Sequence, residues 1–150
     1  MTEADFPLLS LIITIPLLGA LLAGSIRNVD VAKQIAFFTA LITFVLTACA
    51  TLLFDADKSG FQLVERYDWI PLLKLEYLVG VDGISVLFLP MTGLLTIITM
   101  LASWSAISHS SRFHFSLLLA LESVSIGVFC ALDTVLFFLF WELTLPPFFF

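Results

Sequence analysis

The chain has 150 residues, of which 61% are hydrophobic and only 12% are charged. A soluble domain usually carries about a quarter charged residues, so the composition excludes an ordinary water-soluble protein and favours lipid as the surrounding solvent. The net charge of −6 does not indicate nucleic-acid binding, because half of the acids lie in one connecting segment at 55–82. We interpret these acids as solvation outside the membrane.

The charged residues divide the chain into five apolar runs and one long polar connection. A helix needs about 20 residues to cross roughly 30 Å of hydrocarbon. The first four runs meet that length, whereas the fifth is shorter and has no polar exit, as if the chain were the front part of a longer protein. We therefore predict an all-α integral membrane protein with a single transmembrane region at 1–150. Its helices are expected at about 6–26, 34–54, 83–107, 113–132 and 134–150, with an external loop at 55–82.

The connecting segment has a pattern of its own on both sides of Pro71. Apolar and polar residues alternate there, and this period of two is typical of β-strands. The alternating apolar set is Phe61, Leu63, Tyr67, Trp69, Leu73, Leu75, Tyr77 and Val79. The pattern predicts a β-hairpin, and an interfacial segment with its aromatic rings at the lipid headgroups fits it about equally well.

The orientation follows from the Lys and Arg residues of the short loops, which favour the inner side of a membrane. Arg27, Lys33 and Arg112 fall on one side, whereas the turn at Asp133 on the other side has no basic residue. We expect the N-terminus and the 55–82 loop to lie outside.

Two acids, Glu122 and Glu142, lie within the apolar runs. An ionised, unpaired acid at mid-membrane costs several kcal/mol, so it persists mainly where it faces protein, a cation or water. Each acid lies ten residues from Leu132, so an antiparallel helix pair would place both at one depth, about 15 Å from the turn. We predict that they form a proton relay with raised, coupled proton affinities. The alternative is a protonated carboxyl that only hydrogen-bonds a neighbouring helix.

Pro146 and Pro147 follow the second acid. A proline in a helix has no N–H to donate, so these two release the carbonyls of Glu142 and Leu143. Such loosened backbone at bilayer depth is tolerated only against protein or water. We predict a helix break in an ion path here, with a kink that serves packing as the alternative.

The fourth apolar run carries small residues at helical spacing, which allow another helix to approach closely. We interpret this stripe as a packing face. Its members are Ser116, Ala120, Ser123, Gly127 and Ala131.

Two segments make the sequence resemble a known family. The first is Tyr-Leu-Val-Gly-Val-Asp-Gly-Ile-Ser at 77–85, leading into a helix that ends in Ala-Ser-Trp at 102–104. The second is Ala-Leu-Asp-Thr-Val-Leu-Phe-Phe-Leu-Phe-Trp-Glu-Leu at 131–143, with Pro147 after it. The chain thereby resembles the M-type antiporter-like subunit of proton-pumping NADH–quinone oxidoreductase, respiratory complex I, over about the first third of such a subunit.

The resemblance implies a 14-helix parent fold with an outside N-terminus. It also implies that Glu142 matches the membrane-buried glutamate at the start of the family's proton channel, whereas no family role carries over to Glu122. Two departures matter. Pro146 stands where an aliphatic residue is usual, and the apolar runs contain no counterpart of the family's buried lysines. On this basis the chain alone lacks part of a proton channel.

We therefore expect a membrane-arm segment of complex I that takes part in proton translocation coupled to quinone reduction. Its partners would be other membrane-arm subunits and the lipid bilayer of the inner (cytoplasmic) membrane, which it crosses several times. No redox cofactor, metal or directly bound NADH is expected. One rival is a subunit of a multi-subunit cation/proton antiporter or membrane-bound hydrogenase. Another is a truncated structural membrane protein that moves no ions.

Overall fold

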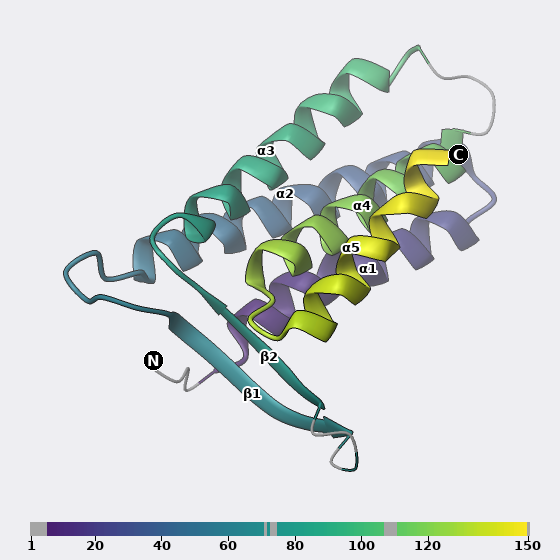
Figure 1. The fold of residues 1–150 in the computed structure, drawn as a ribbon. Helices are drawn as coiled ribbons and strands as arrows, with labels where there is room; N and C mark the ends of the chain where they lie inside the picture. The colour runs from purple at the N-terminus through teal and green to yellow at the C-terminus, as the bar shows by residue number, and fades with distance from the viewer. Residues whose placement is uncertain (1–5, 71, 73–74, 107–110, 150) are drawn as a thin grey trace.

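The computed structural model describes residues 6–70, 72, 75–106 and 111–149, which form five helices and one β-hairpin (Figure 1). Four helices are long and apolar enough to cross a membrane, and α5 is shorter. The predicted all-helical membrane fold is therefore confirmed. The helices are α1 (Leu8–Ser25), α2 (Val29–Leu53), α3 (Ser85–Ser103), α4 (Ser111–Cys130) and α5 (Thr134–Phe149), and the strands are β1 (Gln62–Ile70) and β2 (Leu75–Val81).

The helices begin where a side chain satisfies the first free backbone N–H groups. The Asn28 side chain accepts hydrogen bonds from Asp30 N and Val31 N, so α2 starts before the expected residue 34. Asp30 and Lys33 therefore lie within the first turns of α2. The expected boundary, which was placed after the charged residues, excluded both from the helix. Capping therefore decided this boundary more than charge did.

Aspartates cap two further helices in the same way. Asp82 accepts hydrogen bonds from Ile84 N and Ser85 N at the start of α3, and Asp133 accepts from Val135 N and Leu136 N at the start of α5. Both aspartates belong to the two segments that carry the family resemblance, and the structure gives each a definite local role.

The 55–82 segment contains the predicted β-hairpin. β1 and β2 pair antiparallel, with Tyr67 opposite Tyr77 and Asp68 opposite Glu76. The hairpin packs across one end of the helices (Figure 1). There Leu132 N donates a hydrogen bond of 2.9 Å to Leu78 O, which ties β2 to the turn between α4 and α5.

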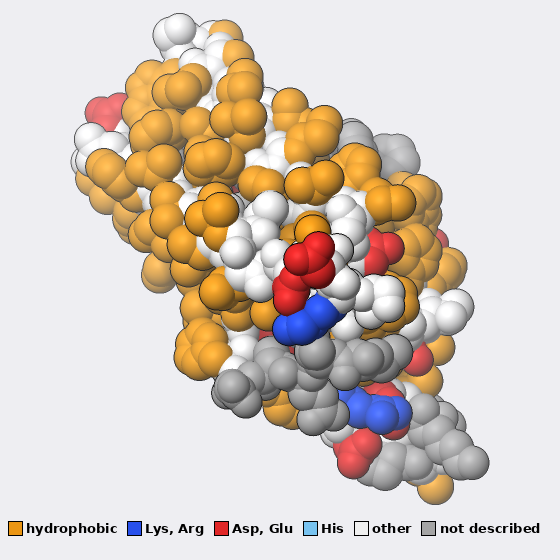
Figure 2. Space-filling view, turned by 90° about the vertical axis from the view of Figure 1, so that its left-hand side faces the viewer, with side chains coloured by type: hydrophobic (Ala, Val, Ile, Leu, Met, Phe, Trp, Pro, Cys, Tyr) orange, Lys and Arg blue, Asp and Glu red, His pale blue; other side chains and the backbone are white. Residues whose placement is uncertain are grey.

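Large apolar side chains cover the outside of the helices. Leu21, Phe38 and Phe138 are each at least 60% exposed, and hydrophobic side chains dominate the face seen in Figure 2. A protein in water would bury such a surface, whereas lipid accepts it without penalty.

The interior is organised around α4, which packs against α1, α2, α3 and α5. Because α4 contacts every other helix, each of its faces has a different neighbour. The direction in which Glu122, the acid of α4, points therefore determines which helix it contacts.

Candidate functional site

Glu122 lies on α4 and is only 1% exposed. Neither of its carboxyl oxygens has a hydrogen-bond partner among the described residues. A buried acid without a partner is costly to ionise, and it marks a position where a proton, a cation or water is the natural companion.

Glu122 forms part of the wall of a groove of about 310 Å³ between α3 and α4. From α3, Thr96 is 9% exposed, and Thr99, one turn further along the helix, is exposed. The full lining is Thr92, Leu95, Thr96 and Thr99 from α3, with Leu118, Leu121, Glu122, Ser125 and Phe129 from α4.

Glu142 lies on α5 and is exposed. The ring of Phe140, two residues earlier, faces Gly127 of α4. Two residues turn a helix by about 200°, so Glu142 points away from α4. Glu122 lines the groove between α3 and α4, whereas Glu142 lines neither that groove nor the one between α4 and α5. The predicted coupling between the two acids stays a prediction.

Pro146 and Pro147 lie inside α5, which is continuous from Thr134 to Phe149. Neither proline can donate a backbone hydrogen bond, so the carbonyls of Glu142 and Leu143 lose their helical partner. A functional break at this point stays a prediction.

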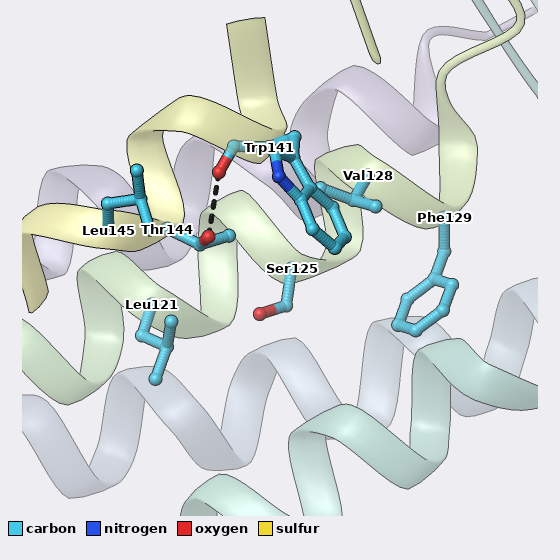
Figure 3. A pocket seen from close by; sticks show the side chains of 7 residues that line it. All are labelled: Leu121, Ser125, Val128, Phe129, Trp141, Thr144 and Leu145. Carbon is cyan, nitrogen blue, oxygen red and sulfur yellow. Dashed lines mark hydrogen bonds between the residues drawn. The ribbon is translucent and has the colours of Figure 1, made fainter. Parts of the chain in front are cut away.

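A second groove of about 420 Å³ separates α4 from α5 (Figure 3). Its walls are mainly apolar, and the Thr144 hydroxyl donates a hydrogen bond of 2.7 Å to Trp141 O within α5. The lining is Leu121, Ser125, Val128, Phe129, Trp141, Thr144 and Leu145.

The small-residue stripe of α4 is a packing face, as predicted. Ser116 and Ser123 each donate a hydrogen bond of 2.6 Å to a carbonyl of α1, those of Ala20 and Ile13 respectively. Gly127 accommodates the ring of Phe140 from α5. The stripe therefore holds α1 and α5 closely against α4, beside Glu122.

Glu65 on β1 is a polar residue that the sequence analysis missed. It is 4% exposed, so the expectation that the loop acids are solvated is wrong for this one. Its carboxylate accepts hydrogen bonds from Leu9 N at 2.6 Å, from Ser10 N at 3.1 Å and from the Ser10 hydroxyl. It thereby caps the N-terminus of α1 across the hairpin–helix boundary, where negative charge is favoured.

Tyr77 on β2 lies next to this cap. The Ser10 hydroxyl lies 3.0 Å from the Tyr77 hydroxyl, and burial raises the pKa of that phenol. The phenol of Tyr77 therefore stays neutral, so it places no second negative charge beside the Glu65 carboxylate. The hairpin thus supplies both polar groups that surround the start of α1.

Comparison with known proteins extends these observations. No protein-family model matches the chain. It is 42% identical over 149 residues to "NAD(P)H-quinone oxidoreductase chain 4" of Prochlorococcus marinus (strain MIT 9303), covering 97% of this chain and 26% of the relative. The protein of the same name from Synechococcus sp. (strain CC9605) is 41% identical over 149 residues, covering 97% and 28%.

The chain is related to NAD(P)H-quinone oxidoreductase chain 4. The resemblance to a complex I antiporter-like subunit is thereby confirmed. The chain spans about a quarter of the length of the chain 4 proteins that it matches.

A solved structure shows the same fold. In the membrane-bound sulfane sulfur reductase, an archaeal respiratory membrane complex, one chain matches with a TM-score of 0.75 and 23% identity. The match covers 93% of this chain and 22% of that one. At 23% identity this likeness shows the arrangement of the helices alone. The sequence relationship rests on the chain 4 proteins, which are about 40% identical to this chain.

Proposed function

We propose that the chain is part of a membrane-arm subunit of an NAD(P)H-quinone oxidoreductase and takes part in proton translocation coupled to electron transfer. The observation that carries the proposal is the 42% identity to a chain 4 protein over almost the whole chain. Two acids within the apolar helices support it, because an acid inside a membrane span marks an ion pathway more often than a structural contact.

In this proposal Glu142 and Glu122 are the proton-carrying groups. A carboxyl can both accept and donate a proton, which is what a relay group has to do. The carbonyls freed by Pro146 and Pro147 provide acceptors near Glu142 for the water that a proton path requires.

The chain itself would bind neither NADH nor a redox cofactor. It would lie in the inner (cytoplasmic) membrane beside other membrane subunits. Electron transfer would then take place in those partners, and this chain would respond to it by moving protons.

The rival assignment to another respiratory or antiporter assembly is weaker. The reductase structure shares the fold at 23% identity, whereas the chain 4 relatives share about 40% of residues. Fold alone does not separate these assemblies, since one fold supports several functions, and the closer sequence relationship favours quinone reduction.

Replacing Glu142 tests the proposal. Glu142→Gln keeps the size and hydrogen bonding of the side chain and removes its titration. In the assembled complex we expect proton pumping and coupled quinone reduction to fall by at least about tenfold. Oxidation of NADH with an artificial acceptor should be unchanged, because it does not need the membrane arm.

The matched control is Glu76→Gln, at an acid on the hairpin that pairs with Arg66 outside the helices. It should pump normally. If Glu142→Gln assembles and pumps as well as this control, Glu142 is not a relay group.

A further inference from the structure

The end of the helix bundle opposite the hairpin is basic. The α1–α2 connection, the end of α3 and the start of α4 lie there (Figure 1). Among the described residues of these segments, Arg27, Lys33 and Arg112 are basic and Asp30 is the one acid. Arg27 and Arg112 are exposed, whereas Lys33 is partly buried. Lys33 therefore has surroundings that the two arginines lack.

Neutral groups hold the Lys33 ammonium in place. Its Nζ donates a hydrogen bond of 2.8 Å to Trp104 O at the end of α3. It also lies 5.9 Å from the ring centre of Trp104 and 5.6 Å from that of Phe115. No carboxylate of the described residues forms an ion pair with Lys33. A carbonyl and ring faces fix a cation without neutralising it, so the two remaining N–H donors suit an anion.

An apolar groove of about 270 Å³ adjoins this ammonium. Phe37, Leu101 and Trp104 line it, and the rings of Phe37 and Trp104 pack edge to face with their centres 5.9 Å apart. Leu101 is 54% exposed and Phe38, next to Phe37, is 60% exposed, so the groove belongs to the apolar outer surface of the helices. Trp104 contributes both to the groove and to the surroundings of the ammonium.

We infer that Lys33 and this groove form a binding site for one anionic phospholipid. The phosphate lies against the Lys33 ammonium, and the first part of an acyl chain lies against Phe37, Leu101 and Trp104. A cation next to an indole ring at the end of membrane helices is suited to the boundary between headgroups and hydrocarbon. A soluble anion would gain nothing from the apolar groove. The inference does not depend on the proposed proton relay.

Photocrosslinking in the assembled complex tests the site. The complex is placed in nanodiscs that contain equal amounts of phosphatidylglycerol and phosphatidylcholine, with photoreactive benzoylphenylalanine in place of Leu101. Mass spectrometry of the crosslinked peptide identifies the captured lipid. We expect the anionic lipid to be captured about five times as often as the zwitterionic one, the effect of one basic group on an anionic headgroup.

Leu87 is the matched control position for the photoreactive residue. It lies on the same helix, is 60% exposed, and is about 21 Å away along the axis on nearly the same face. Both leaflets of a nanodisc have the same composition, so a probe at Leu87 should capture the two lipids about equally.

Variants of the basic residues separate a site from general attraction to a positive surface. With the probe at Leu101, Lys33→Gln should reduce the preference to about one to one, whereas Lys33→Arg should keep it, since a cation remains. Arg27→Gln removes an exposed charge at the same end and should leave the preference unchanged. An excess of inorganic phosphate at constant ionic strength should not displace the lipid.

The site is refuted if the probe at Leu101 captures both lipids equally, or captures protein in place of lipid. It is also refuted if Arg27→Gln lowers the preference as much as Lys33→Gln does. Displacement of the lipid by inorganic phosphate would show a phosphate site without a lipid tail. Normal pumping by Glu142→Gln would overturn the proposed relay and leave the lipid site standing, because lipid capture is measured without pumping.

Discussion

Glu65 should contribute more to stability than any exposed acid of the hairpin. Glu65→Ala removes the acceptor of Leu9 N, Ser10 N and the Ser10 hydroxyl at a site that is 4% exposed. Leaving a buried N–H unsatisfied costs about 1 to 3 kcal/mol, so two backbone donors amount to about 2 to 6 kcal/mol. Glu65→Gln keeps one carbonyl acceptor and should cost about 1 to 2 kcal/mol.

Reversible unfolding in mixed detergent micelles measures these free energies. The control is Glu76→Ala, which breaks the exposed pair with Arg66 at 2.7 Å and should cost about 0 to 1 kcal/mol. If Glu65→Ala is no more destabilising than Glu76→Ala, the carboxylate does not hold the start of α1.

Two further predictions concern helix packing and pH. A Cβ at Gly127 would lie 2.6 Å from the ring of Phe140, so Gly127→Ala should destabilise the α4–α5 pair by about 1 to 3 kcal/mol. Adding Phe140→Leu should recover part of that loss in the same unfolding assay. A hydrogen bond from Ser85 N lowers the pKa of Asp82 below its ordinary value of 3.8. Its contribution to stability is therefore complete above about pH 4 and lost as the pH falls through the lowered pKa, and Asp82→Asn should flatten this part of a stability–pH curve.

The membrane fold was predictable because it depends on local properties of the sequence. The length of an apolar run determines whether a helix can cross a bilayer. The alternation of apolar and polar residues on both sides of Pro71 predicts the two β-strands. Boundaries were less accurate. Asn28 starts α2 by capping, which overrides the charges of Asp30 and Lys33 that follow it.

Alternation places Glu65 on the same face as Leu63 and Tyr67, but it did not predict that Glu65 alone of the loop acids is buried, because the strand is irregular there. The pairing shifts register between Gln62 and Glu65, and Leu63 has a φ of 53°. Val64 and Glu65, although consecutive, are both buried. A bulge re-aims side chains in this way. The backbone donors that Glu65 meets belong to α1, far away in the sequence.

The two acids of α4 and α5 show where counting residues stops. A constant rise per residue predicts one depth for both acids from their equal distance to Leu132. The direction in which each acid points around its helix depends on how the helices pack. Gly127 of α4 receives Phe140 of α5, and Glu122 lies five residues from Gly127, about 140° around the helix.

Glu122 therefore faces α3, and Glu142 lies about 200° around α5 from the ring that contacts α4. Two acids at the same depth need not lie close together, because the fit between small and large side chains determines which faces of two helices are in contact. A relay that uses both acids has to connect opposite sides of the α4–α5 pair.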